Sequence, residues 1–355
     1  MNPILFALVA FQAPVALTKP DKTIDQPFSQ LVSVRELKDG RVLVVDSKEK
    51  VVQIADFESG TVTTIGRNGS GPGEYRLPAG LVPMPAGRTL VYDPMNQRFL
   101  DLSGDGKVQG LVTFSSLTGL KGVPMMILPA ADAKGRLYFE PINPAAMGGK
   151  DSTAVLRWTE GKAGLDTAGF VGSMDLGVEM KDGKPRLRAM KMFAPQETWV
   201  IDPAGRLARI APEPYRVIWY GSGPPIVGQT VAYQPVPVAE ADKDMLRAAF
   251  KQGMAAVGSA AAAIKMPEPE FAATKPPFAG RGAAVAAPNG EVWVSRSVGA
   301  KAPAEYDRFD GRGRLAGRIT LVPQAAVIGF GKQTVYVARK DQDDLMYLER
   351  HRMPN

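Results

Sequence analysis

The segment DGRVLVVD, residues 39–46, decides the fold, because similar segments recur along the whole chain. Each copy begins with a turn centred on glycine and continues into an apolar or alternating stretch. The other copies are AGRTLVYD at 86–93, KGRLYFEP at 134–141, AGRLARIAP at 204–212, NGEVWVSR at 289–296 and GKQTVYVAR at 331–339. Asp-Gly, Asn-Gly and Ala-Gly supply the positive φ that a tight hairpin needs, and the β-branched and aromatic residues that follow favour strands. The sequence therefore contains six strand–turn–strand units.

The residues after each copy supply further strands. Residues 51–56 and 61–65 complete the first repeat, and residues 98–102 and 107–114 complete the second. Four strands per repeat, at a spacing of about 40 to 50 residues, are typical of propeller blades. The 37 glycines and 30 prolines also suit many short strands joined by turns. We therefore predict an all-β fold, a six-bladed β-propeller with four strands in each blade.

Two longer spacings locate insertions in this pattern. One lies between the third and fourth copies at residues 161–192, and the other lies between the fourth and fifth copies at residues 230–280. The second is rich in proline and has apolar residues at helical spacing after acidic residues at 240–244, which complement the dipole of a helix start. We predict a helical insertion between blades four and five of a single propeller domain that spans residues 21–355.

The predicted ring must also close, because an open sheet edge is a hazard for pairing with other chains. The sixth blade, residues 325–353, has room for three strands, at 327–331, 334–338 and 345–350. We expect residues 24–34, near the N-terminus, to supply the fourth strand.

The N-terminus carries the apolar run ILFALVAFQAPVAL at residues 4–17. This run is too short to span a bilayer as a helix, and its length is typical of a signal peptide. We therefore predict a signal-peptide-like segment at residues 1–20 and an extracytoplasmic location, periplasmic or secreted, with a first β-strand as the alternative. No other stretch is long and apolar enough to cross a membrane, so we expect no transmembrane segment in the mature chain.

The composition excludes several kinds of chemistry. The chain has no cysteine, which rules out disulfides, thiolate metal sites and a cysteine nucleophile. Its single histidine, His351, cannot build a histidine metal cage, and we expect it on the surface of the last strand. The net charge of +7 permits a polyanionic partner, but the charges are scattered. The basic run at 181–191 lacks aromatic residues, so we expect a solvated loop there and no nucleic acid.

Two further segments carry a family resemblance. Residues 66–80 read GRNGSGPGEYRLPAG, and residues 91–107 read VYDPMNQRFLDLSGDGK. Together they resemble the NHL repeat of six-bladed propellers, and the tail at 305–319 and 334–353 resembles the ends of exported bacterial propellers of unassigned function. We interpret the glycine-rich loop as structural, because its glycines permit unusual backbone conformations, its proline stiffens the turn and its glutamate can accept amide hydrogen bonds. These loop residues are Gly69, Gly71, Pro72, Gly73 and Glu74.

Candidate ligand contacts are aromatic and cationic residues near the predicted strand ends, since ligands of such folds bind to the loops there. They are Tyr75, Arg76, Arg98, Arg281, Arg296 and Tyr306. The best acidic cluster for a metal is Asp341, Asp343 and Asp344 in KDQDDL, whose oxygens suit a hard cation such as calcium. This segment lacks the glycine and the closing glutamate of an EF-hand loop, and a solvated turn is the other interpretation. We therefore assign no metal and no cofactor.

Three functions remain open at this point. The first is a non-catalytic binding or scaffold propeller of the bacterial cell envelope, which engages a protein, peptide or glycan through its funnel face and the insertion. The second is a calcium-dependent hydrolase like the lactonases that share the six-bladed architecture. The third is a polyanion-binding surface protein. From the sequence we favour the first and assign no catalytic residue.

Overall fold

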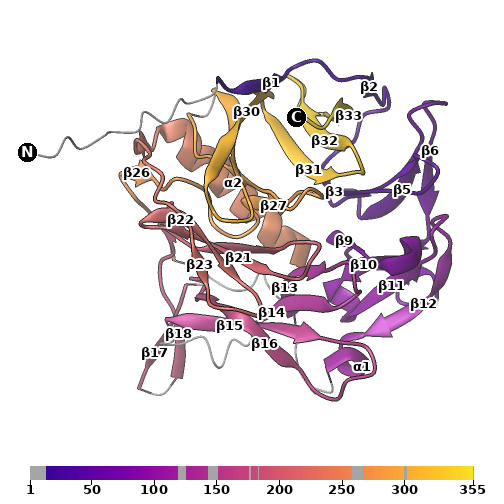
Figure 1. The fold of residues 1–355 in the computed structure, drawn as a ribbon, viewed down its shortest axis with the longest axis horizontal. Helices are drawn as coiled ribbons and strands as arrows, with labels where there is room; N and C mark the ends of the chain where they lie inside the picture. Colours follow the sequence, from indigo (N-terminus) through magenta and orange to yellow (C-terminus); the bar gives the residue numbers. More distant parts are fainter. Residues whose placement is uncertain are drawn as a thin grey trace, which may run out of the picture.

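The computed structural model describes residues 13–118, 125–142, 151–175, 177–182, 184–257, 267–299 and 302–354. Within these residues, six antiparallel sheets of four strands follow one another along the chain, and one of the sheets gains a fifth strand. Figure 1 shows the sheets arranged around a ring, with the indigo first blade beside the yellow last blade. The predicted six-bladed β-propeller with four-stranded blades is confirmed.

The first three blades follow the predicted order of strands. Blade 1 contains β3 (Leu31–Glu36), β4 (Val42–Asp46), β5 (Val51–Ala55) and β6 (Val62–Ile65). Blade 2 contains β9 (Gly80–Pro83), β10 (Thr89–Asp93), β11 (Arg98–Leu102) and β12 (Val108–Thr113). Blade 3 contains β13 (Met125–Ala131), β14 (Leu137–Ile142), β15 (Ser152–Trp158) and β16 (Asp166–Gly172).

The last three blades repeat this arrangement. Blade 4 contains β20 (Thr198–Ile201), β21 (Leu207–Pro212), β22 (Tyr215–Tyr220) and β23 (Ile226–Val227). Blade 5 contains β27 (Ala284–Ala286), β28 (Val292–Ser295), β29 (Pro303–Phe309) and β30 (Leu315–Pro323). Blade 6 contains β31 (Ala325–Phe330), β32 (Thr334–Lys340) and β33 (Met346–Arg352). In every blade the first strand lies at the centre of the ring, where it lines a shared cavity.

The N-terminal part of the chain closes the ring, but the strand itself lies before the predicted range. The fourth strand of blade 6 is β2 (Lys22–Thr23), which pairs antiparallel with β33. Within the predicted range 24–34, Ile24 and Phe28 continue this pairing, since the Ile24 amide donates to the Leu348 carbonyl and Phe28 forms an antiparallel bridge with Met346. Leu31 belongs instead to β3 of blade 1. A further strand, β1 (Val15–Leu17), pairs in parallel with β30 as the fifth strand of blade 5. Residues 1–12 lie outside the described residues, so the signal peptide stays a prediction.

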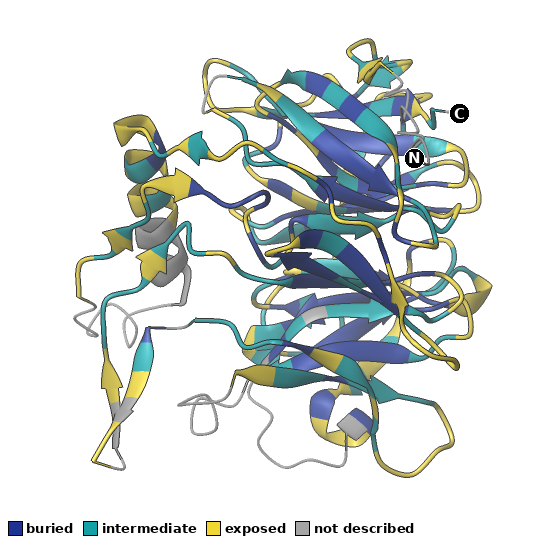
Figure 2. Ribbon diagram, turned by 60° about the vertical axis from the view of Figure 1, so that its left-hand side comes forward, coloured by how far each residue is buried: buried dark blue, intermediate teal, exposed yellow. Residues whose placement is uncertain are grey.

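The insertions connect fourth strands to the first strands of the next blades. The predicted insertion at 161–192 begins too early, because β16 within it is the fourth strand of blade 3, which its two glycines and one alanine had obscured. The helix predicted between blades 4 and 5 is confirmed as α2 (Glu240–Val257), and Figure 2 shows it to one side of the blades. No described helix is long and apolar enough to cross a membrane. The small inserted strands are β17 (Val178–Lys181), β18 (Lys184–Leu187), β19 (Lys191–Met192), β24 (Val236–Pro237), β25 (Glu270–Phe271) and β26 (Thr274–Lys275).

Short elements occupy loops of the first two blades. The glycine-rich loop holds two strands that pair in parallel, and blade 2 holds two 3-10 turns and a short helix. These elements are β7 (Arg67–Asn68), β8 (Glu74–Tyr75), η1 (Pro85–Gly87), η2 (Pro94–Asn96) and α1 (Phe114–Thr118).

Buried apolar layers fill the spaces between neighbouring blades. Between blades 1 and 6, Val42 and Val44 pack with Tyr336, whose ring stacks on Phe57 at a centroid distance of 6.0 Å. Burying one such side chain contributes about 1.5–3 kcal/mol, so each layer ties two blades together. The ring is therefore a stable frame for the groups at its centre.

One type of turn recurs at three Gly-Arg pairs of the chain. In the sequence Asp-x-x-Gly-Arg, the aspartate side chain accepts two hydrogen bonds from the arginine. Its Oδ1 accepts one from the arginine backbone amide, and its Oδ2 accepts one from the arginine Nε. The glycine adopts a positive φ. The turn Asp202–Arg206 shows both bonds at 2.8 Å, and Gly205 has a φ of +86°. The same pattern occurs at Asp132–Arg136 and at Asp310–Arg314. An aspartate that bonds to amides along the chain stabilises a tight turn, so these residues serve the fold.

Candidate functional site

A cavity of about 540 Å³ occupies the centre of the ring. The first strands of all six blades, or the turns after them, contribute to its wall. Most of the wall is apolar and includes small residues such as Ala284 and Ala286, which leave space where the strands converge. Among the described residues that line the cavity, the charged or hydroxyl-bearing ones are Ser33, Arg35 and Asp132. An apolar cavity with a few polar groups is typical of a small-molecule site.

A second cavity of about 430 Å³ adjoins the first, at the end where first strands turn into second strands. Arg35, Pro288 and Phe330 line both cavities, so the two spaces meet at these side chains. The charged residues that line the second cavity are Arg35, Glu36, Lys38 and Lys332. We call this opening the cationic mouth and define it by Arg35, Lys38 and Lys332.

Arg35 is half-buried between the two cavities. Its Nε is buried without a hydrogen-bond partner, and Arg35 forms no ion pair with any described residue. Burial lowers the pKa of Arg35 from its ordinary value, and the neighbouring Glu36 charge acts in the opposite direction. Because a guanidinium stays protonated in proteins, Arg35 places a positive charge at the centre of the ring without a hydrogen-bonded counter-ion.

Glu36 follows Arg35 in β3 and is held by blade 6. Its Oε2 accepts hydrogen bonds from Thr334 Oγ1 and Tyr336 Oη, both at 2.6 Å, and its Oε1 accepts one from the Lys332 amide at 3.2 Å. Burial raises the pKa of Glu36, but these hydrogen bonds outweigh burial and hold the pKa below its ordinary value of 4.5. Glu36 is therefore ionised at neutral pH.

Lys38 and Lys332 complete the cationic mouth from the turns of blades 1 and 6. Both are exposed, and neither forms an ion pair with a described residue. The stem of Lys38 passes over Gly87, where an added Cβ would lie 3.1 Å from Lys38 Cε. Among the described residues that line this cavity Glu36 is the one carboxylate, so three positive charges face one negative charge there.

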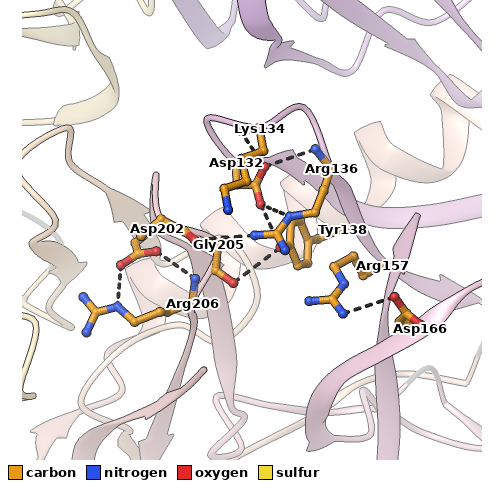
Figure 3. A network of polar contacts seen from close by, with 10 residues as sticks. Asp132, Lys134, Arg136, Tyr138, Arg157, Asp166, Asp202, Gly205 and Arg206 are labelled. Carbon is orange, nitrogen blue, oxygen red and sulfur yellow. Dashed lines mark hydrogen bonds and ion pairs between the residues drawn. The ribbon is translucent and has the colours of Figure 1, made fainter. Parts of the chain in front are cut away.

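Asp132, the other charged residue of the central cavity, is engaged by its own turn (Figure 3). Its Oδ2 accepts hydrogen bonds from Arg136 Nε at 2.5 Å and from Tyr138 Oη at 2.9 Å, and its side chain is fully buried. Tyr138 Oη also lies 3.4 Å from the carbonyl oxygen of Gly205, which links blade 3 to the turn of blade 4. Burial, together with the Asp132 contact, raises the pKa of Tyr138 to about 12. This network supports the wall and leaves no free carboxylate.

The glycine-rich loop is filled by its own glutamate. Glu74 Oε2 accepts the Gly71 amide at 2.7 Å, and Oε1 accepts Arg67 Nε at 2.7 Å. A Cβ at Gly69 would lie 2.1 Å from Glu74 Oε2, so only glycine leaves room for this carboxylate. An anion site of the kind that phosphate loops offer is thus occupied from within, which supports the structural interpretation of the loop.

Three of the predicted ligand residues lie beside this loop. The buried Tyr75 donates its hydroxyl to the Ile65 carbonyl at 2.6 Å. Arg98 donates to three carbonyl groups of the loop, including that of Ser70 at 2.9 Å. Arg76 is exposed, and no hydrogen bond or ion pair of its side chain occurs with a described residue. Their role in binding stays a prediction.

The other three predicted ligand residues belong to blade 5 and its approach. Arg281 forms a two-pronged ion pair with Glu140 at 2.8 and 3.0 Å, and Arg296 donates to Asp307 at 2.8 Å. Tyr306 is buried, and its hydroxyl accepts the Val327 amide at 2.9 Å. These side chains are committed to contacts within the protein, so we do not include them in the proposed site.

The predicted acidic cluster forms a hairpin turn. Asp341 Oδ1 accepts the amides of Asp343 and Leu345 at 2.9 and 3.0 Å, and Asp344 pairs with Lys340 at 2.6 Å. No group of three or more acidic or histidine side chains that could hold a metal occurs among the described residues. Calcium takes six to eight oxygen ligands, and Glu36 is the one carboxylate among the described residues that line the second cavity, so these residues do not fit a calcium ion.

His351 is not the surface residue that we expected. Its side chain is 2% exposed, and Nε2 lies 3.2 Å from Glu349 Oε2. The reason is the closure by β2, which turns β33 from an edge strand into an interior strand.

No protein-family model matches the chain, and no curated protein matches it in sequence. Solved structures with a similar fold include a gluconolactonase from Xanthomonas campestris, 12% identical, with a TM-score of 0.48 over 96% of this chain and 97% of that chain. The calcium-binding protein regucalcin from Agrobacterium tumefaciens is 11% identical, with a TM-score of 0.45 over 95% of each chain. An aldose sugar dehydrogenase from Streptomyces coelicolor, bound to PQQ, is 12% identical, with a TM-score of 0.46 over 94% of this chain and 98% of that chain. What the chain shares with them is its fold.

The expectation of a non-catalytic scaffold for a protein, peptide or glycan is corrected by these comparisons, because similar solved structures include a gluconolactonase, a sugar dehydrogenase and a streptogramin B lyase, which are enzymes. The low identities restrict the likeness to the fold, so the activity must be argued from the residues of this chain. The polyanion-binding alternative stays a prediction.

Sequence reasoning missed the charged residues of the cationic mouth. They belong to no known motif, and Lys38 and Lys332 lie at opposite ends of the sequence. A signal was nevertheless present, since both lysines occupy the turn after the first strand, in blade 1 and in blade 6. Ring closure makes those two blades neighbours, so the two turns had to meet.

Proposed function

We propose that the chain is a small-molecule hydrolase that opens a lactone or cleaves an ester, with the central cavity and the cationic mouth as its active site. The observation that carries this proposal is Arg35, a guanidinium without a hydrogen-bonded counter-ion, which lines both cavities beside the ionised Glu36. The apolar wall would hold the carbon skeleton of the substrate, and the ester group would lie at the junction of the two cavities.

The two side chains suit the two demands of ester hydrolysis. Water adds to the carbonyl carbon and gives one proton to Glu36, whose Oε1 accepts a single hydrogen bond within the protein. The negative charge that develops on the carbonyl oxygen is stabilised by Arg35. When the carbon–oxygen bond to the leaving group breaks, the alkoxide takes the proton from Glu36. The products are an alcohol and a carboxylic acid, joined in one molecule if the substrate is a lactone.

The test is turnover of a panel of lactones and esters, some neutral and some with a second, anionic group, followed as acid release at constant pH. We expect Glu36→Gln to lower kcat about a hundredfold or more, since general-base catalysis contributes about 10²–10⁴-fold. Glu160→Gln removes one exposed carboxylate elsewhere and should leave turnover unchanged. Thermal melts check that each variant is folded. A folded wild-type chain that cleaves none of the panel, or a fully active Glu36→Gln, refutes the proposal.

We also propose that the chain is exported from a bacterial cell. The apolar run at 4–17 supports this proposal. Because residues 15–17 form β1 at the rim of blade 5, removal of a signal peptide before residue 15 would keep that strand. N-terminal sequencing of the secreted chain tests the proposal, and a mature protein that stays in the cytoplasm with residues 1–14 intact contradicts it.

A further inference from the structure

Arg35 is a partly buried guanidinium without a hydrogen-bonded counter-ion among the described residues. A buried charge is unfavourable unless it is paired or hydrogen-bonded, and arginines in protein interiors are usually paired. Other partly buried arginines obey this rule, as Arg281 does with Glu140 and Arg136 does with Asp132. Arg35 departs from it, because its Nε is buried without a partner and the residue lines the junction of two cavities.

The two lysines add positive charge on the same side of this junction. Lys38 follows β3 and Lys332 follows β31, so both stand on turns at the same end of the ring. Both lysines line the second cavity together with Arg35, and neither has an ion-pair partner among the described residues. Together with Arg35 the lysines bring three positive charges, and the Glu36 carboxylate balances one of them. Glu36 already accepts hydrogen bonds from Thr334, Tyr336 and the Lys332 amide. An excess of two positive charges therefore faces the opening.

We infer that the cationic mouth binds the carboxylate or phosphate group of an anionic small molecule, with Arg35 as the direct hydrogen-bonding partner and the two lysines as charge partners. Resting on the proposed function, this names the substrate class as an ester or lactone that carries a second, anionic group. A planar guanidinium has five N–H donors, so it can hold two oxygens of the anionic group and still donate to the ester carbonyl oxygen, while lysines act as point charges. The apolar cavity behind Arg35 takes the uncharged part of the same molecule.

The experiment measures binding of unreactive anions by titration calorimetry at low salt, so that it does not depend on turnover. The probes are acetate, succinate and inorganic phosphate. We expect Arg35→Gln to weaken binding tenfold or more, because hydrogen bonds to charged groups are the strong ones. Arg35→Lys, which keeps the charge, should recover part of this loss. Lys38→Gln and Lys332→Gln should each weaken binding about threefold at low salt, and salt should remove that difference because exposed charges are screened.

The control is Arg352→Gln, which removes one exposed arginine from the far end of the chain and should bind like the wild type. Equal binding by wild type and Arg35→Gln, or no binding of any probe by the folded wild type, overturns the inference. Preference for succinate or for phosphate decides between the two kinds of anion. Anion binding at Arg35 without turnover of any ester refutes the hydrolase proposal but supports the anion-binding inference. Turnover without anion binding supports the hydrolase proposal but refutes the anion-binding inference.

Discussion

Replacing Gly205 with alanine tests whether the network of Figure 3 holds blades 3 and 4 together. An added Cβ at this position would lie 2.2 Å from Arg136 Nη2, 2.5 Å from Asp132 Oδ2 and 2.8 Å from Tyr138 Oη. The φ of +86° alone disfavours alanine by about 1–2 kcal/mol. Displacing a hydrogen bond to the Asp132 carboxylate adds about 1.5–3 kcal/mol. We therefore expect a loss of about 2.5–5 kcal/mol in the free energy of unfolding.

The matched control is Gly290→Ala. Gly290 occupies the equivalent turn of blade 5 with a φ of +83°, and nothing lies within 4 Å of a Cβ built there. In this variant the free energy of unfolding should fall by only about 1–2 kcal/mol, because alanine is unfavourable at a positive φ. Guanidinium unfolding followed by tryptophan fluorescence measures both variants, since Trp199 and Trp219 are buried in blade 4. If both variants lose the same free energy of unfolding, backbone conformation alone explains the need for glycine at 205. The proposed steric clash with the network would then be refuted.

Three further predictions follow from other contacts. Glu140→Ala leaves Arg281 buried without its counter-ion, so we expect denaturant unfolding to show a free energy of unfolding lower by about 3–5 kcal/mol. Replacing both Glu140 and Arg281 with apolar residues should restore most of this loss. Deleting residues 1–23 removes β2 as well as β1 and should lower the melting temperature clearly more than deleting residues 1–20, because only the longer deletion reopens blade 6. The lowered pKa of Glu36 stabilises the fold fully above pH 4.5, and this contribution disappears as the pH falls through the lowered value. The stability difference between wild type and Glu36→Gln, from melts across this pH range, should therefore shrink on acidification, and a constant difference would contradict the assignment.

Much of the fold could be predicted because propeller blades repeat a local signal. Glycines such as Gly40 and Gly290 adopt positive φ in the expected turns, and the apolar strands that follow them are buried. The errors arose where that signal is weak. Strand β2 has two residues, and β16 contains two glycines, so neither shows the alternation that identifies a strand. Their pairing comes from neighbouring strands, which is information about the tertiary structure.

The site was harder to predict than the fold. Arg98 and Arg281 were among the candidate ligand contacts, yet their partners are carbonyl groups and a carboxylate that lie far away in sequence. Arg35 carried no sequence signal, because its distinguishing property is the absence of a partner among the described residues. Such a property exists only once every neighbour has been placed.

The closing strand also sets a constraint on synthesis. Strand β2 leaves the ribosome among the first residues, while its partner β33 reaches to residue 352. During translation the growing chain is an open arc whose first and last blades each lack a neighbour, and such exposed apolar faces and strand edges favour aggregation. The ring is sealed in a single late event of high contact order, which slows folding. A chain that stops short of the last blade therefore leaves blade 1 uncovered and the cationic mouth without Lys332.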